Sequence, residues 1–107
     1  MKAGFGPRLI VISLTVVFSV YTFAESGEDI FKRKCAGCHG ANGAGNTTIG
    51  KNLKLRDLGS PDVQKQTDEE LSAIIGKGKS GKMPPFENKL TKEQISDVVK
   101  FIRTLKK

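Results

Sequence analysis

Both cysteines of the 107-residue chain and its single histidine lie within one short stretch, KCAGCHGANG, as Cys35, Cys38 and His39. Two thiols three residues apart, followed directly by an imidazole, suit four kinds of site. These are a structural disulfide, a thiol redox centre, part of a zinc site, or the covalent attachment point of a haem. The rest of the sequence distinguishes among the four.

Three of these alternatives fit poorly. A disulfide between Cys35 and Cys38 would close a very short loop, which removes little entropy from the unfolded chain. A redox CxxC pair normally begins a helix after a strand, whereas this pair comes late in an expected helix. Structural zinc commonly takes four Cys or His ligands, and the sequence has no fourth one. A carboxylate would complete only an uncommon zinc set.

A covalent haem accounts for all three residues together. On a helix, Cys35, Cys38 and His39 stand at i, i+3 and i+4 and so share one face. Two sulfurs can then bond the two vinyl groups of a haem while the imidazole ligates the iron, which is the basis of the CxxCH signal. The sequence predicts one haem c, attached through Cys35 and Cys38, with His39 as an axial ligand.

Met83 is the expected second axial ligand. No second histidine exists, and Met83 is the only methionine besides Met1. It lies in the glycine- and proline-rich stretch KMPPF, where filling a gap in a core is a weaker explanation for a methionine. Ligation by His39 and Met83 would raise the reduction potential of the iron.

The N-terminal segment, residues 1–24, is expected to be a secretory signal that is cleaved after Ala24. Lys2 and Arg8 precede an uncharged run from Leu9 to Ala24, which is shorter than the roughly 20 residues of a membrane-spanning helix. The alternative is an uncleaved anchor. Without Lys2 and Arg8, the net charge of +7 falls by two, so the domain at residues 25–107 stays basic. We expect an exported, periplasmic protein that is soluble after removal of the signal.

The sequence of residues 25–107 predicts an all-α fold of three or four short helices with long loops. Helix-capping residues and terminal glycines mark the expected helices. The glycine-rich residues 40–60 are expected to be a loop. The expected helices are one from the Ser26 cap to Gly40, a short turn from Ser60, one from the Thr67–Glu70 capping box to Gly76, and a last one from the Thr91–Gln94 capping box to about Leu105.

The motifs CAGCHG and KMPPF resemble those of class I c-type cytochromes, in the short bacterial monohaem branch. Members of this branch are soluble carriers or haem domains linked to oxidases and dehydrogenases. The resemblance runs from Gly27 to Leu105 and implies a cytochrome c fold, in which the first and last helices cross near a right angle. It implies that Gly27 lets Phe101 pack closely, with Phe31 beside it. It also implies a haem pocket lined by Leu53, Leu58, Leu71, Ile74 and Ile75.

The chain departs from the family pattern after the attachment motif. Many members carry a Gly-Pro pair there, and the proline carbonyl accepts the histidine ring N–H. Here the stretch is IGKN, so a carbonyl near Gly50 or Lys51 is expected to accept the ring N–H of His39. Lys51, Asn52 and Arg56 are candidates to bind the haem propionates.

We expect a one-electron carrier and not an enzyme, with redox proteins as partners and no small-molecule substrate. A dehydrogenase, a bc1-like complex or a terminal oxidase would fit. Lys77, Lys79 and Lys82 are expected to form a basic rim that attracts acidic docking surfaces. Nucleic acid is not expected of an exported chain without interleaved basic and aromatic residues. The alternatives are a peroxidase-like haem enzyme whose Met83 leaves or never reaches the iron, and a haem-free thiol protein.

Overall fold

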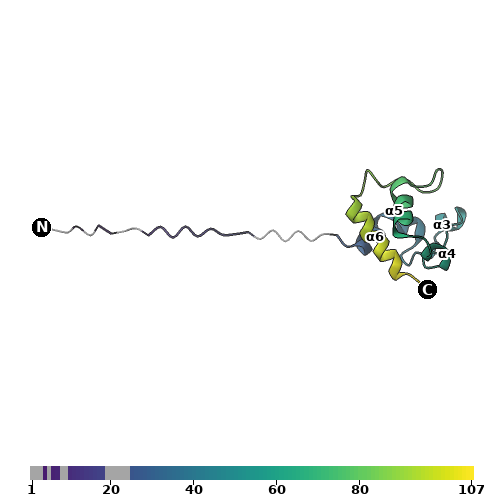
Figure 1. Cartoon of the computed structure of the whole chain (residues 1–107), viewed down its shortest axis with the longest axis horizontal. Coiled ribbons are helices and arrows are strands. Elements are labelled where there is room, and N and C mark those ends of the chain that lie inside the picture. Colours follow the sequence, from purple (N-terminus) through teal and green to yellow (C-terminus); the bar gives the residue numbers. More distant parts are fainter. Residues whose placement is uncertain (1–3, 5, 8–9, 19–24) are drawn as a thin grey trace.

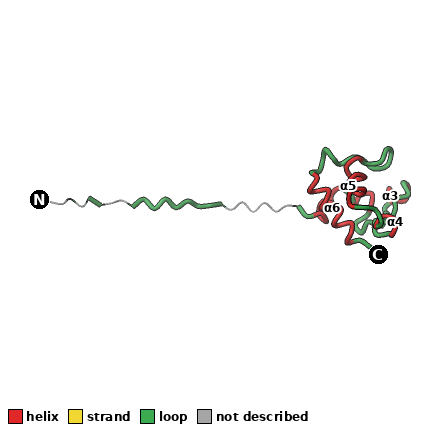
Figure 2. Tube along the Cα trace, viewed as in Figure 1, coloured by secondary structure: helices red, strands yellow, loops and turns green. Residues whose placement is uncertain are grey.

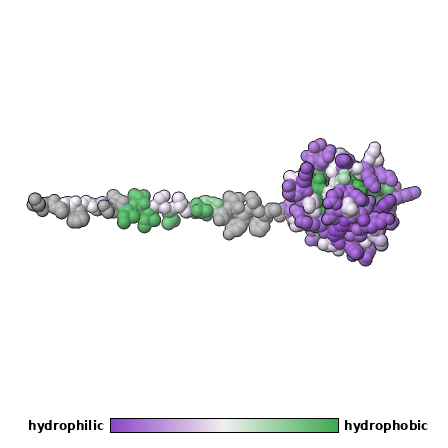
Figure 3. Space-filling model, viewed as in Figure 1, coloured by the Kyte–Doolittle hydropathy of each residue, from purple (hydrophilic) through white to green (hydrophobic). Residues whose placement is uncertain are grey.

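The computed structural model describes residues 4, 6–7, 10–18 and 25–107. The predicted signal segment therefore falls partly outside the described residues, and so does its expected cleavage site after Ala24. Residues 10–18 contain neither helix nor strand, and their large apolar side chains are exposed, in contrast to the mainly hydrophilic surface of the folded part (Figure 3). In the part of the chain that the structure describes, no helix combines the length and apolar character needed to cross a membrane.

Six helices and no strand are present in the described residues, so the all-α prediction is confirmed (Figures 1 and 2). The expected number of three or four helices is too low for two reasons. The first expected helix is interrupted at Cys35, and a further short helix lies in the glycine-rich stretch predicted as loop. The helices are α1 (Gly27–Lys34), α2 (Ala36–His39), α3 (Thr48–Asn52), α4 (Pro61–Gln64), α5 (Asp68–Lys77) and α6 (Lys92–Thr104).

Side-chain caps begin the longer helices where the sequence predicts them. Ser26 and Thr67 each accept a backbone N–H three residues on, at 3.1 Å. Thr91 and Gln94 exchange both bonds of a capping box, at 3.1 and 2.8 Å. These bonds satisfy N–H groups that have no partner within the helix.

The expected end of α5 at Gly76 is wrong. The helix continues to Lys77, and Gly78 ends it with φ +69°. Gly76 stays helical and buried, and its carbonyl accepts the backbone N–H groups of Phe86 and Glu87, each at 3.1 Å. Gly76 therefore anchors the chain that leads to α6.

The core forms where α1 packs against α6. Ile30 and Phe31 of α1 are almost fully buried, as are Val98 and Val99 of α6. The rings of Phe31 and Phe101 lie 5.0 Å apart between centroids and are tilted by 52°, so the expected pairing of these two rings is confirmed. This arrangement of offset, inclined rings is favourable for aromatic side chains.

Gly27 allows the backbones of α1 and α6 to approach each other closely. A Cβ atom on Gly27 would collide with the backbone carbonyl of Asp97 and would lie 3.1 Å from the Val98 nitrogen. These atoms lie on α6 one turn before Phe101, whose ring packs against Phe31. The α6 backbone occupies the space that a side chain at position 27 would fill.

Polar side chains connect the junction between α4 and α5 to α6. The guanidinium of Arg103 donates to the Asp68 carboxylate and to the backbone carbonyls of Gln64 and Gln66. The Gln64 side chain donates in turn to the carbonyls of Leu58 and Ile102, at 2.8 and 3.0 Å. These bonds hold the loop before α4 and the start of α5 against the C-terminal helix.

Replacing Gly27 by alanine is expected to destabilise the domain by about 1–3 kcal/mol, because a backbone carbonyl cannot move aside as a flexible side chain can. The matched control is Gly76→Ala, where the new Cβ would meet only side-chain atoms at 3.8 and 4.0 Å. The control should be neutral or stabilising by up to about 1 kcal/mol. Urea unfolding followed by circular dichroism measures both; equal losses in the two variants would contradict the close-approach explanation.

Candidate functional site

One cavity of about 290 Å³ brings the four predicted site residues together. Cys35, Cys38 and His39 reach it from the end of α1 and from α2, and Met83 reaches it from the loop between α5 and α6. The expected lining is confirmed for four of five positions, while Ile75 is buried in the hydrophobic core instead. The large apolar side chains of the wall are Leu53, Leu55, Leu58, Val63, Leu71, Ile74 and Phe86.

The backbone around the cysteines forms one tight helical turn. The N–H groups of Cys38 and His39 both donate to the Cys35 carbonyl, at 3.2 and 3.0 Å. The Thr47 hydroxyl donates to the Cys38 carbonyl at 2.6 Å and accepts the Gly50 N–H at 2.9 Å. α3 is thereby fixed directly behind the motif, which positions the CxxCH side chains toward the cavity.

Both thiols are free. Burial raises the pKa of the Cys35 thiol to about 11, with a smaller contribution from the neighbouring Cys38. A thiol that stays protonated at neutral pH is a poor nucleophile, whereas redox-active CxxC sites depend on a lowered pKa. The surroundings of Cys35 therefore do not suit thiol redox chemistry.

His39 lies half-buried beside Phe31, with 6.4 Å between the ring centroids. Burial lowers the pKa of the imidazole, which favours its neutral, ligand-competent form. Its Nδ1 atom is buried and has no hydrogen-bond partner in the described part of the chain. The Gly50 carbonyl, an expected acceptor, accepts the Leu55 N–H at 2.9 Å, and no bond from His39 reaches Gly50 or Lys51.

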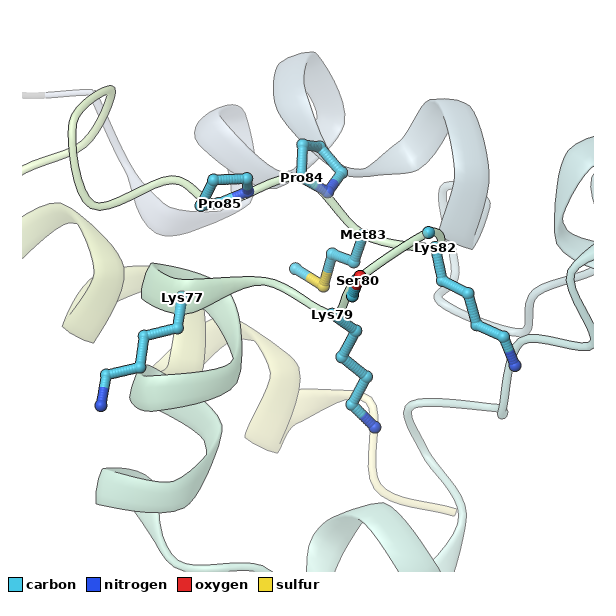
Figure 4. Close-up of a pocket in the computed structure, with 8 residues that line it drawn as sticks. Lys77, Lys79, Ser80, Lys82, Met83, Pro84 and Pro85 are labelled. Atoms are coloured by element: carbon cyan, nitrogen blue, oxygen red, sulfur yellow. The ribbon is translucent and has the colours of Figure 1, made fainter.

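Met83 sits in a small hairpin whose backbone is well defined by hydrogen bonds. Lys79 and Met83 exchange both backbone bonds, each at 2.9 Å. Gly78 precedes this pair at φ +69°, and a Cβ there would lie only 2.5 Å from the Met83 carbonyl oxygen and 2.8 Å from Pro84. Figure 4 shows the Met83 side chain beside this hairpin, between the lysines of the loop. Gly78 and the Lys79–Met83 pair thus fix where Met83 enters the cavity.

The charges around the cavity are all of one sign. Five basic residues line it and no Asp or Glu does. Arg56 is among them, whereas Lys51 and Asn52, the other two propionate candidates, are not. Lys77 lies outside the wall of this cavity as well. The five are Lys34, Lys54, Arg56, Lys79 and Lys82.

Lys34 and Lys54 were not predicted as cavity residues. Their neighbours in the sequence could have indicated this position, since Lys34 precedes Cys35 and Lys54 lies between two leucines. The ion pairs of the described residues involve other bases, away from these five. They are Glu25–Arg33, Glu28–Lys32, Asp57–Lys107, Asp62–Lys65, Asp68–Arg103 and Asp97–Lys100.

The residues present fit a haem better than a metal ion alone. Within residues 25–107 no three Cys, His, Asp or Glu side chains gather into a chelating set. The cavity instead combines an apolar wall, two free thiols, a histidine with an unpartnered ring nitrogen and a basic rim without acids. A haem is a flat apolar group with two vinyl groups and two carboxylates, and each of these features has a counterpart here.

A short helical fold in which a CxxCH turn and a methionine line one apolar cavity is typical of class I c-type cytochromes. Residues 22–102 match the family model described as "Cytochrome C oxidase, cbb3-type, subunit III", and the chain belongs to this family. It is an electron-carrying cytochrome with a covalently bound haem c.

The relatives agree with this class. The chain is 36% identical over 108 residues to a cytochrome c6 of Nostoc sp. strain PCC 7120, with 95% of this chain and 92% of that protein covered. The structure is similar to that of the KustC0563 c-type cytochrome, with a TM-score of 0.70, 33% identity, and 77% and 99% of the two chains covered.

Two longer relatives contain a similar segment. One is the cbb3-type cytochrome c oxidase subunit FixP of Bradyrhizobium diazoefficiens, 33% identical over 85 residues, of which 27% is covered. The other is a nitrite reductase of Stutzerimonas stutzeri, 32% identical over 87 residues, of which 15% is covered. These matches relate the chain to one segment of each of those proteins.

Proposed function

We propose that Cys35 and Cys38 hold the haem through two thioether bonds, and that His39 and Met83 are its axial ligands. The single observation that carries this proposal is that these four side chains line one apolar cavity, although Met83 comes from a distant loop. When bound, the haem supplies an iron that takes up and releases one electron. The chain is then a carrier and not an enzyme, because both axial positions are filled by protein side chains.

The chain contributes a largely apolar environment to this centre. Large apolar side chains form most of the cavity wall around both ligands, and the backbone bonds between Lys79 and Met83 fix the position of the hairpin that carries the thioether. A thioether ligand favours the reduced iron and a high reduction potential. Ligands that are already in place in both oxidation states need little rearrangement on electron transfer.

We further propose that residues 1–24 direct export and are removed, so that residues 25–107 act in the periplasm. The charged start and the uncharged run that follows support this assignment. Partners are proposed to be redox proteins with acidic docking surfaces. The support for that is the group of exposed bases around the cavity, none of which forms an ion pair with the chain's own acids.

Purified mature protein should retain its haem on a denaturing gel and show a six-coordinate, low-spin spectrum that carbon monoxide does not alter. Met83→Leu, which keeps the apolar volume but removes the sulfur, should bind carbon monoxide in the reduced state and lose the iron–sulfur charge-transfer band. Its reduction potential should fall. Ready binding of carbon monoxide by the unaltered protein would refute ligation by Met83 and favour a peroxidase-like enzyme.

Gly78→Ala should weaken the proposed Met83 ligation more than Gly81→Ala does. Both glycines have a left-handed backbone, at φ +69° and +76°, so alanine adds a similar strain of about 1 kcal/mol at each. Only at Gly78 would the new Cβ meet the Met83 and Pro84 backbone, since nothing lies within 4 Å of a Cβ at Gly81. The iron–sulfur band as a function of temperature measures the difference, and identical melting of this band in both variants would contradict the role of Gly78.

Electron transfer to an acidic redox partner should slow with rising salt, by on the order of tenfold or more. The Debye length falls from about 10 Å at 0.1 M to about 3 Å at 1 M salt, which screens the exposed lysines. Lys82→Gln should reduce this salt dependence, whereas Lys100→Gln, whose ammonium group pairs with Asp97 at 3.9 Å, should leave it unchanged. Stopped-flow rates over a salt series decide the matter, and a flat profile for the unaltered protein would exclude an acidic partner surface.

A further inference from the structure

Lys54 has a backbone conformation that the chain otherwise leaves to glycine. Its φ is +54°, the one positive value at a residue other than glycine in the described part of the chain. The left-handed region is strained for a residue with a Cβ and free for glycine. Residues held in such strained conformations cluster at functional sites, which points to a role for this side chain. The five other positive-φ positions are Gly40, Gly43, Gly45, Gly78 and Gly81.

The left-handed turn lets consecutive residues line the same cavity. In an extended segment neighbouring side chains point to opposite faces, yet Leu53, Lys54, Leu55 and Arg56 all line the cavity wall. The segment is held in place by backbone bonds at 2.9 Å from Leu55 to Gly50 and from Leu58 to Gly43. The result is a fixed wall that offers two apolar and two cationic side chains together.

Neither cation of this wall has a counter-charge. Lys54 and Arg56 take part in none of the ion pairs of the described residues, and the cavity lining contains no carboxylate. The other titratable or charged groups that line the cavity are Lys34, Lys79, Lys82, Cys35, Cys38 and His39. The wall is therefore matched to a ligand that brings two negative charges of its own.

We infer that Lys54 and Arg56 bind the two propionate carboxylates of the haem, an assignment that rests on the proposed function. In a haem the propionates lie on the edge opposite the vinyl groups, so Lys34, which adjoins Cys35, belongs with the vinyl edge. Lys79 and Lys82 belong to the hairpin that carries Met83, and in Figure 4 both of their side chains extend away from the Met83 side chain. The arginine fork suits a carboxylate, and the lysine adds a second charge-assisted bond.

As positioning residues, Lys54 and Arg56 keep the propionates ionised. Two ionised carboxylates stabilise the oxidised haem, which carries one more positive charge than the reduced haem. Protonation of a propionate would therefore raise the reduction potential. As long as the bases hold both carboxylates in their charged form, the potential stays constant across the acid-to-neutral range.

The test is the pH dependence of the midpoint potential in five holoproteins: the unaltered protein, Lys54→Gln, Arg56→Gln, Lys79→Gln and Lys82→Gln. Loss of a charge-assisted bond should raise the proton affinity of the propionate about tenfold. The Lys54 and Arg56 variants should thus show a potential that rises as the pH falls, where the unaltered protein is flat. The hairpin variants remove the same charge from the same cavity and should stay flat.

The inference is overturned if the Lys54 and Arg56 variants keep the flat profile. It is also overturned if all four variants change alike, which would indicate a general effect of the positive charges around the cavity on the haem. It is also overturned if these two variants lose only the salt-sensitive rate with an acidic partner, which would place the pair in the docking surface. Failure of the proposed function is distinguished at once, because the unaltered protein would then lack covalent haem or its six-coordinate spectrum.

Lys54→Gly separates the side chain from the backbone. Glycine relieves the left-handed strain, so this holoprotein should unfold at a higher denaturant concentration than the unaltered one. It should nevertheless show the same pH-dependent potential as Lys54→Gln. Greater stability with an unchanged potential profile would show that the lysine has no role toward the propionates.

Discussion

The close approach of α1 to α6 is the contact on which the rest of the domain depends. α1 runs directly into the CxxCH turn. From α6, Arg103 donates to the carbonyls of Gln64 and Gln66, and the Ile102 carbonyl accepts a bond from the Gln64 side chain, so that α6 holds the α4–α5 junction. Gly27 permits this approach by leaving space for the Asp97 carbonyl. A domain of this size that also surrounds a cavity has few other sources of stability. Packing between the first and the last helix therefore fixes the motif that directly follows α1.

The charged side chains form two groups, one paired on the helix surfaces and one unpaired around the cavity. Acids and bases pair on the outer surfaces of the helices, where exposed ion pairs contribute little stability. The bases around the cavity have no such partners, and the cavity wall has no acid. One part of this set, on the rigid segment at residues 53–56, is suited to the haem carboxylates. The part on the Met83 hairpin is exposed and remains available to a partner protein.

Much of the fold and the site could be predicted from the sequence because local signals were strong. Capping residues located the longer helices, and the scarcity of Cys, His and Met left few possible ligands for an iron. Some features that depend on tertiary contacts could not be predicted. The partner of Gly27 is a backbone carbonyl distant in sequence. α5 continues past Gly76 to Lys77, and the Gly76 carbonyl accepts the N–H groups of Phe86 and Glu87. Lys54 could not be distinguished from other loop lysines, since glycine is the usual sequence signal of a positive φ and is absent at this position.

The burial of Cys35 has a consequence for the order of assembly. In the closed domain this residue is only 9% exposed, and burial keeps its thiol protonated at neutral pH. Any catalyst that joins it to a haem must therefore reach it before the domain has closed. Because α1 and α6 lie at opposite ends of the domain, their contact has a high sequence separation and is expected to form late. The interval before this late step is the time available for attachment, so a mutation that accelerates docking of α6 could lower the yield of holoprotein while it stabilises the fold.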